Sequence, residues 1–235
     1  GTVQALGYAL LALSVILIYR SSRVINFAVG ATGVLSAQVM AQLVIRYHAP
    51  YWVGFVVAVA AGATFLGIAE LTVVRRLFTA PRVILLVATI GLAQLAAALM
   101  IALPDPSIAE NRNHFPTPWE RELEWFGIRI AGGEMLLFLA SAAAVVALAL
   151  WMRYSAWGRA IRASAADPDR ARLSGINPGT VSTVVWTLTG AFAGMVTVLQ
   201  EAGDSRAFLT ASPGPAVMVR VLVVAACASF VSFPR

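Results

Sequence analysis

A series of long apolar runs constrains this chain more than any other feature. We distinguish seven runs, at about residues 2–19, 27–46, 51–74, 83–103, 134–152, 179–200 and 215–233. Each is near the ~20 residues that a helix needs to cross the ~30 Å hydrocarbon layer of a bilayer. Charged residues make up 12% of the chain, whereas soluble proteins contain about 25%. The runs lack the alternating pattern of a barrel strand, so spanning segments here have to be helical. The sequence therefore predicts an all-α, polytopic transmembrane bundle of about seven spans, forming one domain over residues 1–235.

The arginines are distributed unevenly between the connections. Eleven follow the first, third, fifth and seventh runs, and five lie in the alternate connections. Basic residues concentrate in cytoplasmic connections. We therefore expect the N-terminus outside, the connection 153–178 in the cytoplasm and the connection 104–133 outside. The net charge of +6 does not indicate nucleic-acid binding, because the basic residues punctuate the apolar runs instead of gathering on one soluble face.

The external connection contains one segment with a strand-like pattern. Residues 125–133, WFGIRIAGG, alternate apolar and polar positions before a Gly-Gly pair. This pattern is typical of a small hairpin. An irregular solvated loop fits the same residues equally well, so both interpretations stay open.

Few residues within the runs could support chemistry. The chain has no HExxH, GxSxG or P-loop motif, and His48 and His114 have no partner at metal-ligand spacing. Glu70 is the one acid inside a run, about one turn from Arg75 and Arg76, which favours an interfacial ion pair. We therefore predict a protein that is not an enzyme, with no metal site, no cofactor and no ATP site. If it transports a solute, a partner has to supply the energy.

The cytoplasmic connection has clear helix start and stop signals. Residues 158–166, GRAIRASAA, predict a short helix. Asp167 and Pro168 then form an N-cap followed by proline at the first helical position, and Gly175 is a natural left-handed terminator. Asn177 begins the next run with the same cap-plus-proline device. These signals predict a helix–turn–helix elbow along the inner face of the membrane.

The exposed side chains of this elbow are expected to be largely alanine, so that another backbone could approach closely. Its arginines could meet acidic groups or lipid phosphates. The residues alone leave two interpretations equally open, a solvated positive-inside loop and a docking surface.

Three stretches resemble a known family. They are RVINFAVGATGVLSA (23–37), LVATIGLAQLAAAL (86–99) and GRAIRASAADPDRARLSGINPGTV (158–181). In order and spacing they are similar to the membrane permeases of branched-chain amino acid ABC transporters, over nearly the whole chain. The third stretch is the most specific and looks like the cytoplasmic loop that contacts the ATPase subunits. The resemblance implies a coupling surface formed by Gly158, Arg159, Arg162, Ala163, Asp167, Ala171, Gly175 and Ile176.

The chain departs from the family pattern at two places. Val29 and Ala31 stand where many relatives have a histidine and an acid. Near the end, ACASFVSFP (226–234) replaces a glycine-rich stretch, and the family normally continues through further spans, so the chain looks C-terminally truncated. Related permeases carry urea, short amides or sugars, and the fold alone does not distinguish these solutes.

Residues at the start of the second run and in the fourth run are candidates for a substrate pathway. Interrupted helices present backbone dipoles to zwitterionic substrates, and glycines permit such breaks. The same glycines fit simple helix–helix packing, as small-x-x-small patterns do, and that alternative stays open. The pathway candidates are Asn26, Phe27, Gly30, Gly33, Thr89 and Gly91.

The leading hypothesis is an ABC importer permease in a bacterial plasma (inner) membrane. It would pair with a second permease subunit as a homo- or heterodimer, and cytoplasmic ATP-binding subunits would drive it through the elbow. An extracytoplasmic binding protein would deliver branched-chain amino acids or a similar small amphipathic solute. One rival is a self-sufficient solute channel or facilitator. Another is an intramembrane enzyme that would depend on Glu70, His48 or Arg220.

Overall fold

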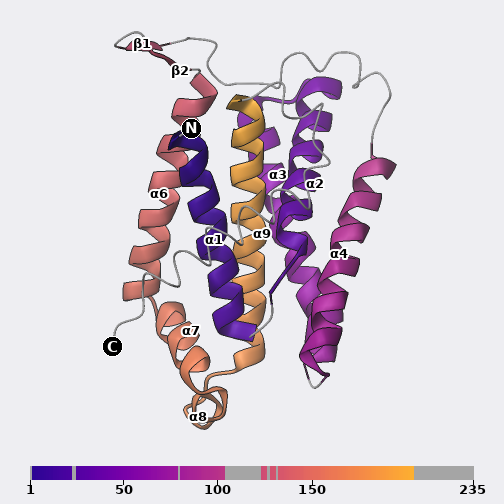
Figure 1. Ribbon diagram of the computed structural model, residues 1–235, viewed down its shortest axis with the longest axis vertical. Helices are drawn as coiled ribbons and strands as arrows, with labels where there is room; N and C mark the ends of the chain where they lie inside the picture. Colours follow the sequence, from indigo (N-terminus) through magenta and orange to yellow (C-terminus); the bar gives the residue numbers. More distant parts are fainter. Residues whose placement is uncertain are drawn as a thin grey trace.

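The structure is a computed structural model, and it describes residues 2–22, 25–78, 80–103, 123–125, 128–130 and 132–203. Long helices run side by side along its longest axis (Figure 1). This arrangement confirms the predicted all-α bundle, to which the described residues add one short hairpin. Among the described residues, five helices are long and apolar enough to cross a membrane, namely Ala28–Arg46, Tyr51–Leu77, Arg82–Ala102, Met135–Tyr154 and Pro178–Glu201.

The number of spans stays a prediction. The first apolar run forms the helix α1 (Thr2–Ser22), in which the apolar segment Gly7–Tyr19 is shorter than the five spans above. The run 215–233, together with Arg220 inside it, lies outside the described residues, and so does His114.

Two of the spanning helices change their winding near one end. The helix α2 (Ala28–Ala41) continues as the π-helical segment η1 (Gln42–Arg46). The helix α3 (Tyr51–Ala69) continues as the π-helical segment η2 (Glu70–Val74) and then as the 3₁₀ turn η3 (Arg75–Leu77). Segments of π-helix are rare and occur often at functional sites. The remaining helices are α4 (Arg82–Ala102), α6 (Gly132–Tyr154), α7 (Ala156–Ala166), α8 (Pro168–Leu173) and α9 (Pro178–Gly203).

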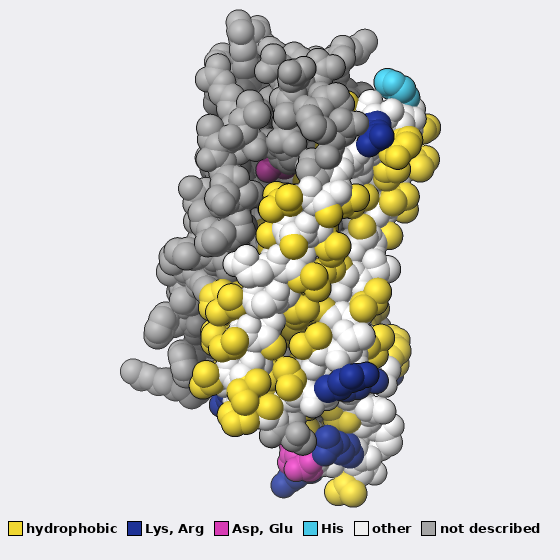
Figure 2. Space-filling model, turned by 90° about the vertical axis from the view of Figure 1, so that its right-hand side faces the viewer, with side chains coloured by type: hydrophobic (Ala, Val, Ile, Leu, Met, Phe, Trp, Pro, Cys, Tyr) yellow, Lys and Arg dark blue, Asp and Glu magenta, His cyan; other side chains and the backbone are white. Residues whose placement is uncertain are grey.

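The helix α9 is the centre of the bundle. It packs against α1, α2, α3 and α6 (Figure 1). Its Trp186 is completely buried and belongs to one apolar cluster with Leu10 and Ile18 of α1. Large apolar side chains such as Val83 and Ile101 of α4 are instead exposed on the outside of the bundle, where Figure 2 shows hydrophobic side chains along the length of the molecule. An apolar exterior is what lipid requires.

Glycines bring three helices together at one crossing. A β-carbon on Gly62 of α3 would lie 2.6 Å from the carbonyl oxygen of Gly190 of α9 and 2.6 Å from the hydroxyl of Ser36 of α2. A β-carbon on Gly194 would lie 2.8 Å from the same hydroxyl. Only glycine permits this approach, which is typical of helix contacts in membranes.

The two ends of the bundle differ in composition. The elbow helices α7 and α8 lie at one end, and the N-terminus and the hairpin lie at the other (Figure 1). The hairpin pairs β1 (Leu123–Trp125) with β2 (Ile128–Ile130) in antiparallel register. A strand therefore does form within the predicted segment 125–133, but its Gly-Gly pair begins α6 and is not a turn. Arginine side chains gather at the elbow end in Figure 2. That the elbow end is cytoplasmic and the N-terminus external stays a prediction.

Candidate functional site

The elbow folds as the start and stop signals predict. The carboxylate of Asp167 accepts hydrogen bonds from the main-chain N–H groups of Asp169 and Arg170, at 3.0 and 3.1 Å, and so caps α8. The helix ends before Gly175, whose φ of 80° is left-handed. The side chain of Asn177 accepts from the N–H of Gly179 at 3.0 Å and begins α9. The first helix starts two residues earlier than expected, at Ala156, because the hydroxyl of Ser155 caps it.

The helix α7 folds back tightly against the end of α6. A β-carbon on Gly158 would collide with the main chain of Met152, so only glycine fits there. The guanidinium of Arg162 donates a hydrogen bond to the same Met152 carbonyl. The guanidinium of Arg159 donates to the carbonyl of Tyr154 at 3.3 Å. The last carbonyls of a helix lack intrahelical partners and carry negative partial charge. The two arginines therefore supply hydrogen-bond donors and positive charge at the C-terminal end of α6.

The surface of the elbow is not the alanine surface that the sequence suggested. Ala171 is buried and Ala160, Ala163 and Ala165 are half-buried, whereas Ala156 and Ala166, near the two ends of α7, are exposed. The other exposed positions include four arginines of α7 and α8, Asp169, and the large apolar side chains of Trp157 and Leu173. Leu173, the last residue of α8, has 90% of its surface exposed. The sequence feature that could have identified this residue is a leucine placed between the polar residues Arg172 and Ser174.

The predicted coupling residues fall into two groups. Arg159, Arg162 and Gly175 are exposed, whereas Gly158 and Ala171 are buried and support the elbow from inside. The other members are half-buried, namely Ala163, Asp167 and Ile176. All eight lie on the elbow, which the structure places at one end of the bundle (Figure 1).

Three of the predicted pathway residues, Asn26, Phe27 and Thr89, lie together at the non-helical break before α2. Residues 25–27 are not helical, and α2 begins at Ala28, whose N–H donates to the side-chain oxygen of Asn26 at 2.8 Å. The hydroxyl of Thr89 from α4 accepts from the N–H of Phe27 at 3.3 Å and donates to the carbonyl of Leu86 at 2.8 Å. Asn26 and Thr89 are completely buried, and the amide nitrogen of Asn26 has no hydrogen-bond partner among the described residues.

The three glycines predicted to line the pathway do not belong to the polar group formed by Asn26, Phe27 and Thr89. Gly30 is buried in the first turn of α2. Gly33 packs on α9, where a β-carbon would collide with the hydroxyl of Thr197, so helix packing explains it. Gly91 is exposed with open space around it, on a different face of α4 from Thr89.

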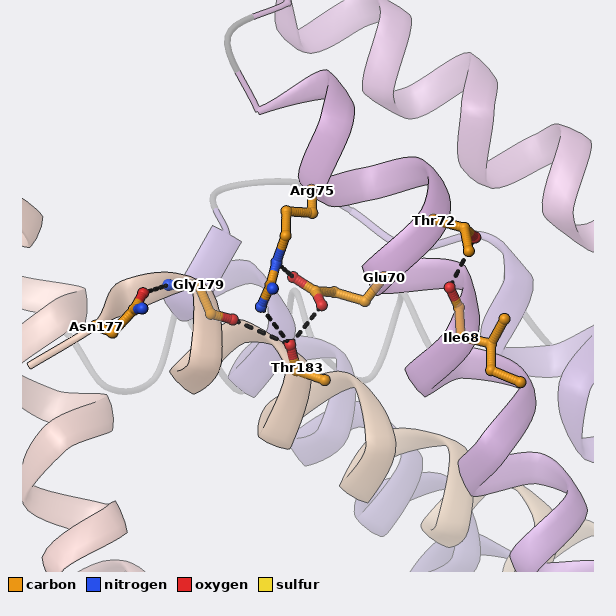
Figure 3. Close-up of polar contacts among 7 residues, drawn as sticks. All are labelled: Ile68, Glu70, Thr72, Arg75, Asn177, Gly179 and Thr183. Carbon is orange, nitrogen blue, oxygen red and sulfur yellow. Dashed lines mark hydrogen bonds and ion pairs between the residues drawn. The ribbon is translucent and has the colours of Figure 1, made fainter.

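The one acid predicted inside an apolar run does form an ion pair. A carboxylate oxygen of Glu70 lies 3.9 Å from Nε of Arg75. Sequence reasoning missed the third member, Thr183 of α9, because nothing in the sequence brings residues 70 and 183 together (Figure 3). Among the described residues there is no group of three or more histidine, cysteine or acidic side chains that could hold a metal ion.

Comparison with known proteins decides the family. The sequence profile of the family described as "Branched-chain amino acid transport system / permease component" matches residues 1–231. This chain belongs to that family. The match extends over α1 to α9, so the elbow and the non-helical segment before α2 both lie within the matched residues.

Curated members of the family agree with this assignment. The high-affinity branched-chain amino acid transport system permease protein LivH of Escherichia coli is 26% identical over 207 residues, covering 82% of this chain. LivH of Salmonella typhimurium and of Salmonella typhi match equally, at 26% identity over 207 residues. The chain spans 65% of the length of these relatives. No solved structure matches it. The relatives are named as permease proteins of a transport system, and the described part of this chain has several helices that could span a membrane, as a member of this family requires.

Proposed function

We propose that this permease imports branched-chain amino acids or a similar small amphipathic solute, driven by cytoplasmic ATP-binding subunits that dock on the elbow. The relatives are named as branched-chain amino acid permeases, which supports the solute class. In the proposal, an extracytoplasmic binding protein delivers the solute and a second permease subunit completes the membrane dimer. The N-terminus faces outward in the bacterial inner membrane.

The observation that carries the proposal is the shape of the elbow. Its caps and its bonds to α6 give it a fixed fold, yet Leu173 projects almost entirely into solvent at its tip. Tyr154 and Trp157, at the junction of α6 and α7, are exposed as well. Aromatic residues and arginines are enriched among the residues that contribute most to protein–protein binding, so these side chains support a protein partner for the elbow. The exposed arginines around it suit an acidic rim on that partner.

The break before α2 supports a solute pathway. In the described part of the chain, the amide nitrogen of Asn26 is a hydrogen-bond donor without a partner, close to the N-terminus of α2. Helix N-termini favour negative charge, and interrupted helices use this to bind the carboxylate of zwitterionic substrates. We therefore assign Asn26, Phe27 and Thr89 to the pathway.

The test is co-purification and uptake with Leu173 variants. The full-length protein is assembled with its ATPase subunits and binding protein in proteoliposomes, and uptake of labelled leucine, urea and ribose is measured with and without ATP. Leu173→Ser should reduce ATPase association and ATP-driven uptake together. Leu173→Met keeps an apolar side chain and should behave as the parent protein.

Two results would overturn parts of this assignment. Retained ATPase association in Leu173→Ser would remove the elbow tip from the interface. Uptake by the parent protein without ATPase subunits would instead identify a self-sufficient channel. Preference for urea or ribose over leucine would change only the solute.

A further inference from the structure

A buried polar cluster joins α3 to α9 directly above the elbow. The carboxylate of Glu70 is 0% exposed, and its Oε2 accepts a hydrogen bond from the hydroxyl of Thr183 at 2.5 Å. Arg75 donates from a terminal guanidinium nitrogen to the same hydroxyl at 2.9 Å. Figure 3 shows the three side chains meeting between the end of α3 and the start of α9. Burying a carboxylate is costly unless it is paired, so this contact is specific and does not reflect chance packing.

The cluster lies at a mechanically important place. Thr183 is in the second turn of α9, which follows the elbow without any intervening span. A β-carbon on Gly179, in the first turn, would lie 3.4 Å from the guanidinium of Arg75. The elbow is therefore joined to this turn along the chain, as it is joined to α6 at its other end. On the other side, Glu70 and Arg75 belong to η2 and η3, where the helix is wound irregularly.

The hydroxyl of Thr183 has two acceptors but only one proton. Besides Glu70, the carbonyl of Gly179 lies 3.1 Å from it, four residues earlier on the same helix. If α9 moves away from η2, the hydroxyl can therefore donate to its own helix. The side chain of Arg75 is 44% exposed, so it can follow Glu70 or turn to solvent. The two acceptors of the Thr183 hydroxyl are two discrete arrangements of the kind that a bistable contact requires. Oε1 of Glu70 has no hydrogen-bond partner among the described residues, so the carboxylate depends on Thr183 and on the ion pair with Arg75.

We propose that Glu70, Arg75 and Thr183 are positioning residues that transmit displacement of the elbow, through α9, to α3. The inference rests on the proposed function, because it concerns how ATP-driven movement at the elbow reaches the helices that enclose the solute. In one state the hydroxyl of Thr183 ties α9 to Glu70. In the other it returns to Gly179, and α9 is free to shift along α3 at the glycine crossing of Gly62 and Gly190.

The decisive variant is Thr183→Val, which removes the hydroxyl and keeps a side chain of nearly the same shape. The measured quantity is labelled leucine imported per ATP hydrolysed, by the full-length protein assembled with its ATPase subunits and binding protein. Coupling between distant sites is typically worth roughly 5- to 150-fold, so we expect the ratio to fall at least about fivefold. ATPase association should be unchanged, since the elbow surface is intact.

Two matched variants separate transmission from folding. Thr183→Ser keeps the hydroxyl and should restore the ratio. Thr72→Val also removes a threonine hydroxyl from η2, but Thr72 is exposed and donates only to the carbonyl of Ile68 in its own helix, at 2.7 Å (Figure 3). It should leave the ratio unchanged.

The outcomes are distinguishable. An unchanged ratio in Thr183→Val overturns the positioning role and leaves the proposed function intact. If the parent protein imports leucine without ATPase subunits, the proposed function fails, and the positioning role fails with it. If Thr183→Val and Glu70→Gln both fail to assemble, the cluster serves folding alone and the inference is wrong.

Discussion

The guanidinium of Arg162 donates a hydrogen bond to the main-chain carbonyl of Met152, across the turn between α6 and α7. That carbonyl is in the last turn of α6, where no backbone N–H is available to it. A β-carbon on Gly158 would collide with the same main-chain group. One basic residue and one glycine therefore hold the elbow against the membrane-spanning part of the protein.

The first prediction concerns this bond. Arg162→Ala should loosen α7, because a hydrogen bond from a charged donor contributes about 1.5–3 kcal/mol and solvent exposure places this one at or below the lower end. Hydrogen exchange of the amides in residues 156–166 should become faster. Arg172→Ala is the matched control, since Arg172 is also an exposed arginine of the elbow but pairs with the exposed carboxylate of Asp169, at 3.2 Å, and not with α6. Equal exchange in both variants would show that the Met152 contact contributes nothing.

Two glycine-to-alanine substitutions should have opposite signs. Gly158→Ala forces the Met152 main chain to move and should destabilise the protein by about 1–3 kcal/mol, the usual effect of overpacking. Gly91→Ala meets no atom within 4 Å and should stabilise α4 by roughly 0.5–1 kcal/mol, because glycine is a poor helix former. Thermal unfolding in one detergent compares them directly. Destabilisation by Gly91→Ala would point to a contact that the isolated chain does not show.

The cap of α8 gives a third prediction. Asp167→Ala removes the acceptor for two main-chain N–H groups and should cost about 1 kcal/mol of local stability. Asp167→Asn keeps the cap but loses the ion pair with Arg170, at 3.1 Å. Exposed pairs contribute little, so Asn should be close to the parent. The readout is proteolysis within residues 167–175, and rapid cleavage of the Asn variant would contradict this ranking.

The fourth prediction concerns Thr89, which bonds to the non-helical segment before α2. Thr89→Val leaves the buried N–H of Phe27 without its acceptor, which costs roughly 1–3 kcal/mol. We expect a lower unfolding temperature and reduced leucine uptake. Thr89→Ser retains the hydroxyl and should recover most of both. Normal stability and uptake in Thr89→Val would remove this residue from the pathway.

The elbow was highly predictable because its determinants are local. Asp167, Gly175 and Asn177 act on N–H groups and dihedral angles within a few residues of themselves, and all three behave as expected. The apolar runs likewise predict six of the helices to within a few residues, since lipid imposes length and composition.

The remaining features depend on contacts between distant parts of the chain. Thr183 meets Glu70, and Thr89 meets Phe27, only because α3 and α4 pack beside α9 and α2. The direction of a helix face is also set by packing, which is why Ala171 is buried whereas Leu173, two residues later on the same helix, is exposed. Apolar periodicity is weak in a membrane helix, because lipid and protein neighbours are both apolar.

The caps of the elbow bear on how it would meet a partner. Ser155, Asp167, Gly175 and Asn177 each satisfy or terminate backbone within the elbow itself. Its shape is therefore set before any association. Ordering a surface on binding consumes affinity, at about 0.5–1.5 kcal/mol for each immobilised side chain. A preorganised elbow avoids much of that entropic loss, so even a small contact area could engage a partner tightly and release it repeatedly without refolding.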